Sequence, residues 1–394
     1  MTKIDQVKQH LLQEKIDGWL IYDFHGSNSL AHIFLGITPD MATTRRFFYW
    51  IPAKGSPVKL VHAIESHVLD RWPGEKKLYS SWQSLQEELK NLLAGQKKVA
   101  MEYSPNNAIP YLSKVDAGTV DLIRSFGVEV VSSGNFLPYF TASLSEAQGQ
   151  GQIRAGKALD RIVLDTWKWI EKHLQNDQAI TEYDVQQKIV ADFAAAGLVT
   201  DAHPIVGVNE HSADPHYTPQ RTGSSPIRRG DWILIDLWAK ENHPGSVYAD
   251  LTRVGFAGAH PSAKQQEIFH IVREAQVAAT ELVKKRFAAH LALKGYEVDD
   301  AARNVIREAG YGECFIHRTG HNIETSVHGS GTHMDNLEMH DERFVIPNTA
   351  FSIEPGIYFP GAFGVRLEYD LFVHQNGTVD IIGAEQNAIV TLDV

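Results

Sequence analysis

Two acidic residues, Asp236 and Asp250, stand out because each lies in an apolar segment where a charge is costly. The run 232–238 is almost wholly apolar and predicts a strand that is buried on both faces. A carboxylate in such a strand needs compensation. If residues 231–253 fold as a hairpin centred near His243, the two acids are equidistant from the turn and face each other.

The same spacing recurs near the C-terminus. Glu354 and Glu368 are also fourteen residues apart, and a hairpin containing both is centred on Gly361. Facing carboxylates repel each other, so a cation is expected between them. The alternative is that these acids are solvated charges or salt-bridge partners. That alternative explains one pair more readily than two pairs of equal spacing.

Three of the nineteen histidines lie in segments of unusual composition, namely His216, His321 and His328. One neutral imidazole added to four carboxylates makes a mixed nitrogen and oxygen site. Oxygen-rich sites suit Mn²⁺, and imidazole also admits Zn²⁺, Co²⁺ or Fe²⁺. Four carboxylates balance two divalent ions better than one. Two neighbouring ions can hold a bridging hydroxide and polarise a carbonyl group.

The elements that must position these residues fall into two domains. Helices alternate with strands over residues 1–135, which indicates a small α/β domain. A stretch rich in Ser, Gly and Gln follows, and it places the boundary at residue 150. Domains 1–150 and 151–394 result. The second is α+β, with long helices and the strand-rich segments 202–208, 231–238, 246–256, 348–359 and 364–375.

Composition excludes several classes of function. The formal net charge of −11 disfavours nucleic acid as a partner. There is no apolar run long enough to span a membrane, and the N-terminal segment lacks the apolar core of a signal peptide. One cysteine rules out an intramolecular disulfide. We therefore expect a cytoplasmic protein with no membrane or nucleic-acid partner.

The order Asp, Asp, His, Glu, Glu and its local motifs resemble the pita-bread metallopeptidases, which include methionine aminopeptidase, aminopeptidase P and prolidase. The matching motifs are Gly230-Asp-x4-Asp236, Tyr248-Ala-Asp250-Leu-Thr-Arg253, Gly320-His321-x-Ile323, Ser352-Ile-Glu354-Pro-Gly-Ile-Tyr358 and Gly364-Val-Arg-Leu-Glu368. The N-terminal α/β domain resembles that of aminopeptidase P, prolidase and creatinase. The resemblance implies a creatinase-like α/β domain followed by an α+β pita-bread catalytic domain, in a homodimer.

Carried over by motif, the resemblance assigns a role to each candidate residue. Two divalent ions per subunit, with Mn²⁺ favoured over Co²⁺ or Zn²⁺, are bound by Asp236, Asp250, His321, Glu354 and Glu368.

Glu354 is also the implied general base, and His216 and His328 contact the substrate and stabilise the tetrahedral intermediate. Arg366 either orients Glu368 or binds a substrate carboxylate, with a purely structural ion pair as the alternative. His333 is either a further substrate-binding residue or a surface histidine.

Three positions depart from the pattern of the family. Trp238 and Glu324 stand where glycine is usual, and Gly329 follows His328 where an acid is common. None of these changes removes a metal ligand. All are expected near the substrate, so they bear on specificity.

These observations predict metal-dependent hydrolysis of Xaa-Pro peptide bonds in short proline-containing peptides. An Xaa-Pro dipeptidase must also meet the free carboxylate of its substrate, and Arg45 or Arg46 of a second subunit are further candidates for that role. The alternatives are an Xaa-Pro aminopeptidase, a lyase or creatinase-type enzyme on the same fold, and a non-catalytic binding protein. Five intact ligands argue against the creatinase type and the binding protein.

Overall fold

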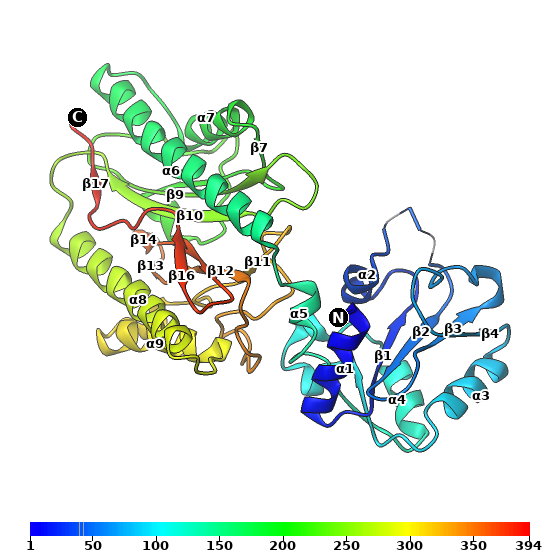
Figure 1. Ribbon diagram of the computed structural model, residues 1–394. Helices are drawn as coiled ribbons and strands as arrows, with labels where there is room; N and C mark the ends of the chain where they lie inside the picture. The colour runs from blue at the N-terminus through cyan, green and yellow to red at the C-terminus, as the bar shows by residue number, and fades with distance from the viewer. Residues whose placement is uncertain (39, 42) are drawn as a thin grey trace. The chain divides into compact units, whose positions relative to one another are not determined.

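The computed structural model describes residues 1–38, 40–41 and 43–394. Within them the chain forms two compact units, Met1–Thr141 and Ala142–Val394. The boundary expected at residue 150 falls inside the long helix α6, Glu146–Gln175, which begins with a capping box at Ser145 (Figure 1). The glycines that suggested a linker serve helix packing instead. A Cβ at Gly149 would lie 2.9 Å from the ring of Phe372.

Unit 1 is a six-stranded sheet with helices, in the strand order β4-β3-β2-β1-β5-β6. Its central strand β1 is buried on both faces, with Trp19 and Ile21 in one apolar cluster and Leu20 and Tyr22 in another. The α/β prediction for this unit is confirmed. Its elements are α1 (Lys3–Glu14), β1 (Gly18–Asp23), α2 (Ser29–Leu35), β2 (Phe47–Pro52), β3 (Val58–His62), β4 (Glu75–Tyr79), α3 (Trp82–Leu92), β5 (Lys98–Met101), α4 (Ala117–Ser125), β6 (Glu129–Ser132) and α5 (Pro138–Thr141).

Unit 2 is α+β, as predicted, and one apolar core runs through it. Its elements are α6, α7 (Glu182–Ala195), β7 (Leu198–Val199), β8 (Ile205–Val208), β9 (Trp232–Glu241), β10 (Ala249–Phe256), α8 (Ala263–Ala288), α9 (Gly295–Glu308), β11 (Asn322–Ile323), β12 (Thr349–Ile353), β13 (Gly356–Phe359), β14 (Phe363–Arg366), β15 (Tyr369–Val373), β16 (Val379–Ile382) and β17 (Val390–Thr391).

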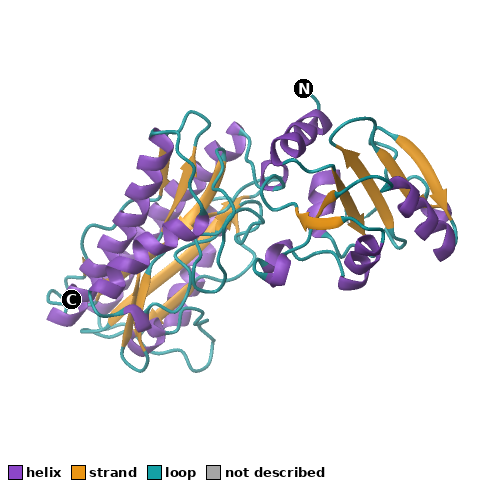
Figure 2. Cartoon of the chain, turned by 90° about the horizontal axis from the view of Figure 1, so that it is seen from below, coloured by secondary structure: helices purple, strands orange, loops and turns teal. Residues whose placement is uncertain are grey.

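The strands of unit 2 form three sheets. One has the order β17-β10-β9-β7 with β8 also paired to β9, one has the order β11-β12-β15-β16, and β13 pairs with β14. Helix α6 packs on β9 and β10, while α8 packs on strands of the C-terminal hairpins. Figure 2 shows the strands of this unit, in orange, with helices packed beside them. Among the described residues, no helix combines the length and apolar character needed to cross a bilayer.

Candidate metal centre

The hairpin of β9 and β10 carries the two aspartates on one face, in a different register from the one predicted. Thr252 lies opposite Asp236, and Asp250 lies opposite Trp238. The turn is therefore centred on residue 244, and the prediction that the two aspartates face each other directly is wrong. A one-residue shift of the centre moves each partner by two residues, which preserves the face because side chains alternate. The aspartates are diagonal neighbours.

The C-terminal hairpin has the predicted register around Gly361. Ile353 pairs with Tyr369 and Gly356 pairs with Arg366, so both paired stretches share the same centre. Glu354 and Glu368 lie in the short interruption between these stretches, in matching positions.

The interruption contains Pro355, which has no N–H to donate to a ladder. An isolated bridge joins Glu368 to Thr252, and it links this hairpin to β10.

His321 brings the two hairpins together at one point. Its Nε2 atom is 3.3 Å from Oε1 of Glu354 and 3.7 Å from Oδ2 of Asp250. One ligand atom from each of Asp250, His321 and Glu368 lies within 4.8 Å of the others. All three side chains are buried. The structure thus gathers four of the five expected ligands into one cluster.

The fifth expected ligand, Asp236, joins this cluster through Arg366. The guanidinium Nη2 atom is 2.6 Å from Oδ2 of Asp236, and both side chains are buried. Nε of Arg366 donates to Thr252 Oγ1 at 3.1 Å, and Nη1 donates to the Tyr358 hydroxyl at 3.0 Å. Arg366 therefore forms an ion pair, which was one of the roles considered for it, and the acid in this pair is Asp236 and not Glu368.

Burial and mutual repulsion dominate the electrostatics of the acids. Burial raises the pKa of Asp250 well above its usual value, and the charges of Glu368 and Asp236 add to this. Burial likewise raises the pKa of Glu368, with Glu354 as the largest contributing charge. The pKa of Glu354 is raised to about 7, again chiefly by burial. Without a cation, the cluster retains protons at pH values where free carboxyl groups have lost them.

The atoms that the cluster offers are suited to a divalent metal ion. In the described part of the chain, Oδ1 of Asp236 and Oδ1 of Asp250 are buried without a hydrogen-bond partner. A buried acceptor in this state is costly, and a cation would satisfy it. Carboxylate oxygens with one imidazole nitrogen suit Mn²⁺, Co²⁺ or Zn²⁺. The Thr252 hydroxyl orients one carboxylate by donating to Glu368 Oε2 at 2.6 Å.

Of the expected catalytic histidines, His328 lies beside the cluster. The rings of His321 and His328 are 4.2 Å apart between centroids and nearly perpendicular. Burial, followed by the charges of Arg318 and His216, lowers the pKa of His328 to about 4, so this imidazole is neutral at pH 7. His216 is exposed, and its proximity contributes to the lowered pKa of His328 and His317.

His333 is fully buried, so it is not a surface histidine. Its Nδ1 atom accepts a hydrogen bond from the backbone N–H of Asn322 at 3.1 Å. The neutral ring therefore carries its proton on Nε2. This bond connects His333 to the residue that follows His321, and a role in substrate binding stays a prediction.

Three residues near the cluster were not predicted. Thr252 lies inside a quoted motif, but only the strand register reveals that it opposes Asp236. His317 Nε2 lies 2.7 Å from the Tyr358 hydroxyl, which also receives Arg366. His317 and Tyr358 belong to segments rich in expected ligands, which is the signal that could have identified them.

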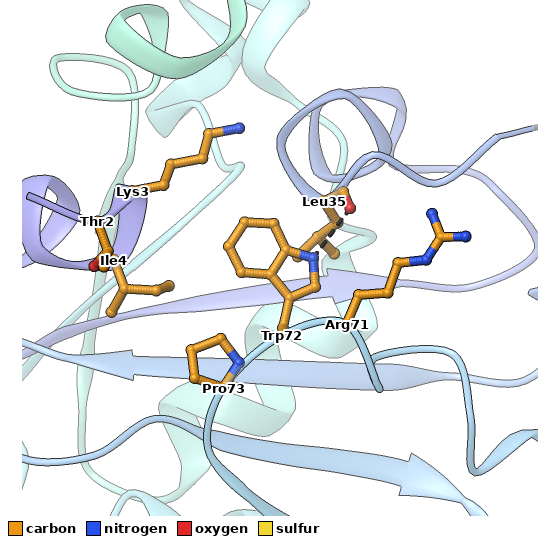
Figure 3. A pocket seen from close by; sticks show the side chains of 7 residues that line it. All are labelled: Thr2, Lys3, Ile4, Leu35, Arg71, Trp72 and Pro73. Atoms are coloured by element: carbon orange, nitrogen blue, oxygen red, sulfur yellow. Dashed lines mark hydrogen bonds between the residues drawn. The ribbon is translucent and has the colours of Figure 1, made fainter.

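Unit 1 contains a pocket of different chemistry (Figure 3). The Trp72 indole stands in it and donates to the Leu35 carbonyl at 3.0 Å. The lining residues are Thr2, Lys3, Ile4, Leu35, Arg71, Trp72 and Pro73. These lining residues include neither a carboxylate nor an imidazole. The side chains of Lys3 and Arg71 repel a metal ion, so this pocket is not a second candidate metal site.

Known proteins resemble the chain across this site. The sequence profile of metallopeptidase family M24 matches residues 151–375, more than half of the 394 residues. The probable dipeptidase PepE of Mycobacterium tuberculosis is 33% identical over 269 residues, covering 68% of this chain and 66% of PepE. The match thus spans just under two thirds of that relative. The Xaa-Pro dipeptidase of Pyrococcus horikoshii is 31% identical over 288 residues, covering 68% of this chain and 75% of that enzyme.

Among solved structures, dipeptidase PepE from Mycobacterium ulcerans superposes with a TM-score of 0.70 at 24% identity. The superposition covers 99% of this chain and 97% of that one. At this level of identity the likeness concerns the fold, and it confirms the pita-bread fold expected from the sequence. Family M24 consists of hydrolases that depend on divalent metal ions. With its profile matched over the whole acidic cluster, the chain belongs to metallopeptidase family M24.

Proposed function

We propose that this protein is a metal-dependent peptidase that hydrolyses Xaa-Pro bonds, with Xaa-Pro dipeptides as its principal substrates. One observation carries the proposal. Asp250, Glu354, Glu368 and the imidazole of His321 lie around one point, Asp236 is joined to them through Arg366, and Oδ1 of Asp236 and Oδ1 of Asp250 are buried without a hydrogen-bond partner. The dipeptidase names of the relatives from Mycobacterium and Pyrococcus support the choice of substrate.

The proposed ligands of two divalent ions are Asp236, Asp250, His321, Glu354 and Glu368. Such ions, when bound, lower the pKa of a water molecule and polarise the carbonyl group of the scissile bond. Thr252 and Arg366 fix the orientation of Glu368 and Asp236. Mn²⁺ suits this oxygen-rich set best, and Co²⁺ or Zn²⁺ fits it as well.

Glu354 is the proposed general base. Its Oε1 atom accepts from the Ser352 hydroxyl at 3.0 Å and lies near Nε2 of His321 at 3.3 Å, so its position is fixed on two sides. A base in this position takes the proton of the attacking water and delivers it to the prolyl nitrogen. Proton transfer by a positioned side chain typically contributes about 10²- to 10⁴-fold in rate.

His216 and His328 are the proposed partners of the scissile carbonyl oxygen. Each ring can offer an N–H donor, and donors aimed at a developing oxyanion stabilise the transition state. His328 is neutral at pH 7 because burial, followed by the charge of Arg318, lowers its pKa to about 4. The ring of His328 also lies next to His321, so a carbonyl oxygen above the metal centre is within its reach.

The bond cut by such an enzyme is a tertiary amide, because the proline nitrogen has no N–H. Peptidases that orient substrates through this N–H fail on it, whereas a metal centre acts on the carbonyl side. A dipeptidase must also bind the free carboxylate of its substrate. Arg366 is already paired with Asp236, so we assign the carboxylate to His333 or to Arg45 or Arg46 of a second subunit in a homodimer.

A rate comparison tests the proposal. The purified protein is incubated with Mn²⁺, Co²⁺ or Zn²⁺ and given Leu-Pro, Leu-Pro-Ala and Leu-Ala. We expect rapid cleavage of Leu-Pro alone. Cleavage of Leu-Pro-Ala but not Leu-Pro would indicate an aminopeptidase, and no prolyl cleavage with any metal would refute the peptidase assignment. Glu354→Gln should lose at least about 100-fold in kcat, whereas Glu342→Gln, at an exposed position, should match the wild type.

A further inference from the structure

The turn that follows His328 is held by the side chains of Asn322 and Glu324, and Glu324 stands where glycine is usual in the family. The turn consists of Gly329, Ser330 and Gly331. The backbone N–H of Ser330 donates to Oε1 of Glu324 at 2.8 Å, and the Ser330 hydroxyl donates to the same oxygen at 3.0 Å. The N–H of Gly331 donates to Glu324 at 3.2 Å and to Oδ1 of Asn322 at 2.8 Å.

Asn322 anchors this arrangement to the sheet. It lies in β11, directly after His321, and its Nδ2 donates to the Ala350 carbonyl of β12 at 2.9 Å. Its own carbonyl accepts from the N–H of Gly329 at 2.7 Å. The turn after His328 is thus bonded to the strand that begins after His321.

Close approach explains why glycine occupies both outer positions of the turn. A Cβ at Gly329 would lie 2.3 Å from Oδ1 of Asn322 and 2.8 Å from Cδ of Glu324. A Cβ at Gly331 would lie 2.6 Å from Cγ of Asn322. A Cβ at position 329 would collide first with Asn322 and next with Glu324, so glycine at this position lets both side chains approach the turn.

Arg343 holds the turn from its other side. Its Nη1 donates to the Ser330 carbonyl at 2.8 Å, and its Nε and Nη2 atoms bond to Asp341. The Glu324 side chain is 7% exposed, so its carboxylate gives up most of its hydration. Three donors on one oxygen offset part of that cost.

We infer that Asn322 and Glu324 form a clamp that positions His328 beside His321. Glu324 and Asn322 are positioning residues, since they act through the turn and not on the substrate. The catalytic part of this inference rests on the proposed function. The clamp itself is a property of the fold.

Two measurements that need no substrate test the clamp. Hydrogen exchange of the segment 324–333 is compared in metal-free wild type, Glu324→Ala and Glu324→Gln, and the ring signal of His328 is followed by NMR. Glu324→Ala should speed exchange at the turn at least about tenfold, which corresponds to about 1.4 kcal/mol, and should shift the His328 signal. Glu324→Gln keeps the Oε1 acceptor and should leave both near wild type. Unchanged exchange and an unmoved signal in Glu324→Ala would overturn the clamp.

Kinetics with Leu-Pro test the consequence for catalysis. A misplacement of about 1 Å can cost about 100-fold, so we expect Glu324→Ala and Gly329→Ala to lose about 10- to 100-fold in kcat at equal metal content. Glu342→Ala, on the exposed side of the same loop, is the matched control. A variant Glu324→Ala that melts earlier yet keeps its kcat would show that the clamp only stabilises the loop. A wild type without prolyl cleavage would refute the proposed function, and exchange with NMR would still decide the clamp.

Discussion

Replacing Glu354 by Gln should stabilise the metal-free protein at alkaline pH while removing its activity. The side chain is held among the acids of the cluster, and burial raises its pKa to about 7. Glutamine has nearly the same shape, and it can still accept the hydrogen bond from Ser352. It differs mainly in that it never carries a charge. The variant therefore isolates the cost of ionising Glu354 in a buried, cation-free site.

The size and sign of the effect follow from proton linkage. The unfolded chain releases this proton near pH 4.5, whereas the folded protein keeps it until about pH 7. Between these values the unfolded state binds fewer protons, so the stability of the wild type falls as pH rises. A pKa of about 7 in place of 4.5 corresponds to about 3 kcal/mol, reached above pH 7. The variant should equal the wild type near pH 4.5 and exceed it by about this amount at pH 8.

Urea unfolding at several pH values between 4.5 and 8, with a chelator present, measures this difference. Comparison with the wild type at each pH cancels the titration of groups far from the cluster. Glu342→Gln, at an exposed position outside the cluster, is the control variant. Saturating Mn²⁺ should reverse the order, because only the wild type keeps the full ligand set. If the difference in free energy of unfolding stayed constant or shrank between pH 5 and 8, the view that these buried acids need a cation for their ionised form would be refuted.

Three further predictions concern the surroundings of the cluster. Arg366→Met should lower the free energy of unfolding of the metal-free protein by about 3–5 kcal/mol, because it leaves Asp236 buried without its ion-pair partner; urea unfolding measures the loss. Thr252→Val removes the hydroxyl that donates to Glu368, and metal affinity should fall about 10- to 100-fold in a competition titration; an unchanged affinity would speak against the orienting role. His216→Ala should lose about 100-fold or more in kcat/KM with an unchanged Tm, since its side chain is exposed, and near-normal activity would remove His216 from the proposed site.

The two hairpins show where sequence reasoning succeeds and where it fails. Only Pro360, Gly361 and Ala362 connect β13 to β14, and so short a connection fixes the register. Its centre could therefore be counted from the sequence. The connection 242–248 between β9 and β10 is longer, so the centre of this hairpin could lie at residue 243 or at residue 244. The faces were predictable from the alternation of the strands, but the facing partners were not.

Arg366 shows a second limit. Its closeness to Glu368 in sequence suggested that it orients that carboxylate. Its actual partner, Asp236, lies 130 positions away along the chain. Such a contact depends on how two sheets meet, and no local pattern in either strand encodes it. Motifs can name the members of the site, whereas their pairing requires the fold.

The shifted register of the first hairpin has a chemical consequence. Because Thr252 and not Asp250 opposes Asp236, the two aspartates are diagonal neighbours and their charges repel less than those of directly opposite acids would. The Thr252 hydroxyl donates to Glu368 and accepts from Arg366, which in turn pairs with Asp236. A chain of bonds from Asp236 through Arg366 and Thr252 to Glu368 thus fixes one oxygen of each of these two acids. Oδ1 of Asp236 and Oδ1 of Asp250 have no hydrogen-bond partner, which leaves them open to the divalent ions that we propose.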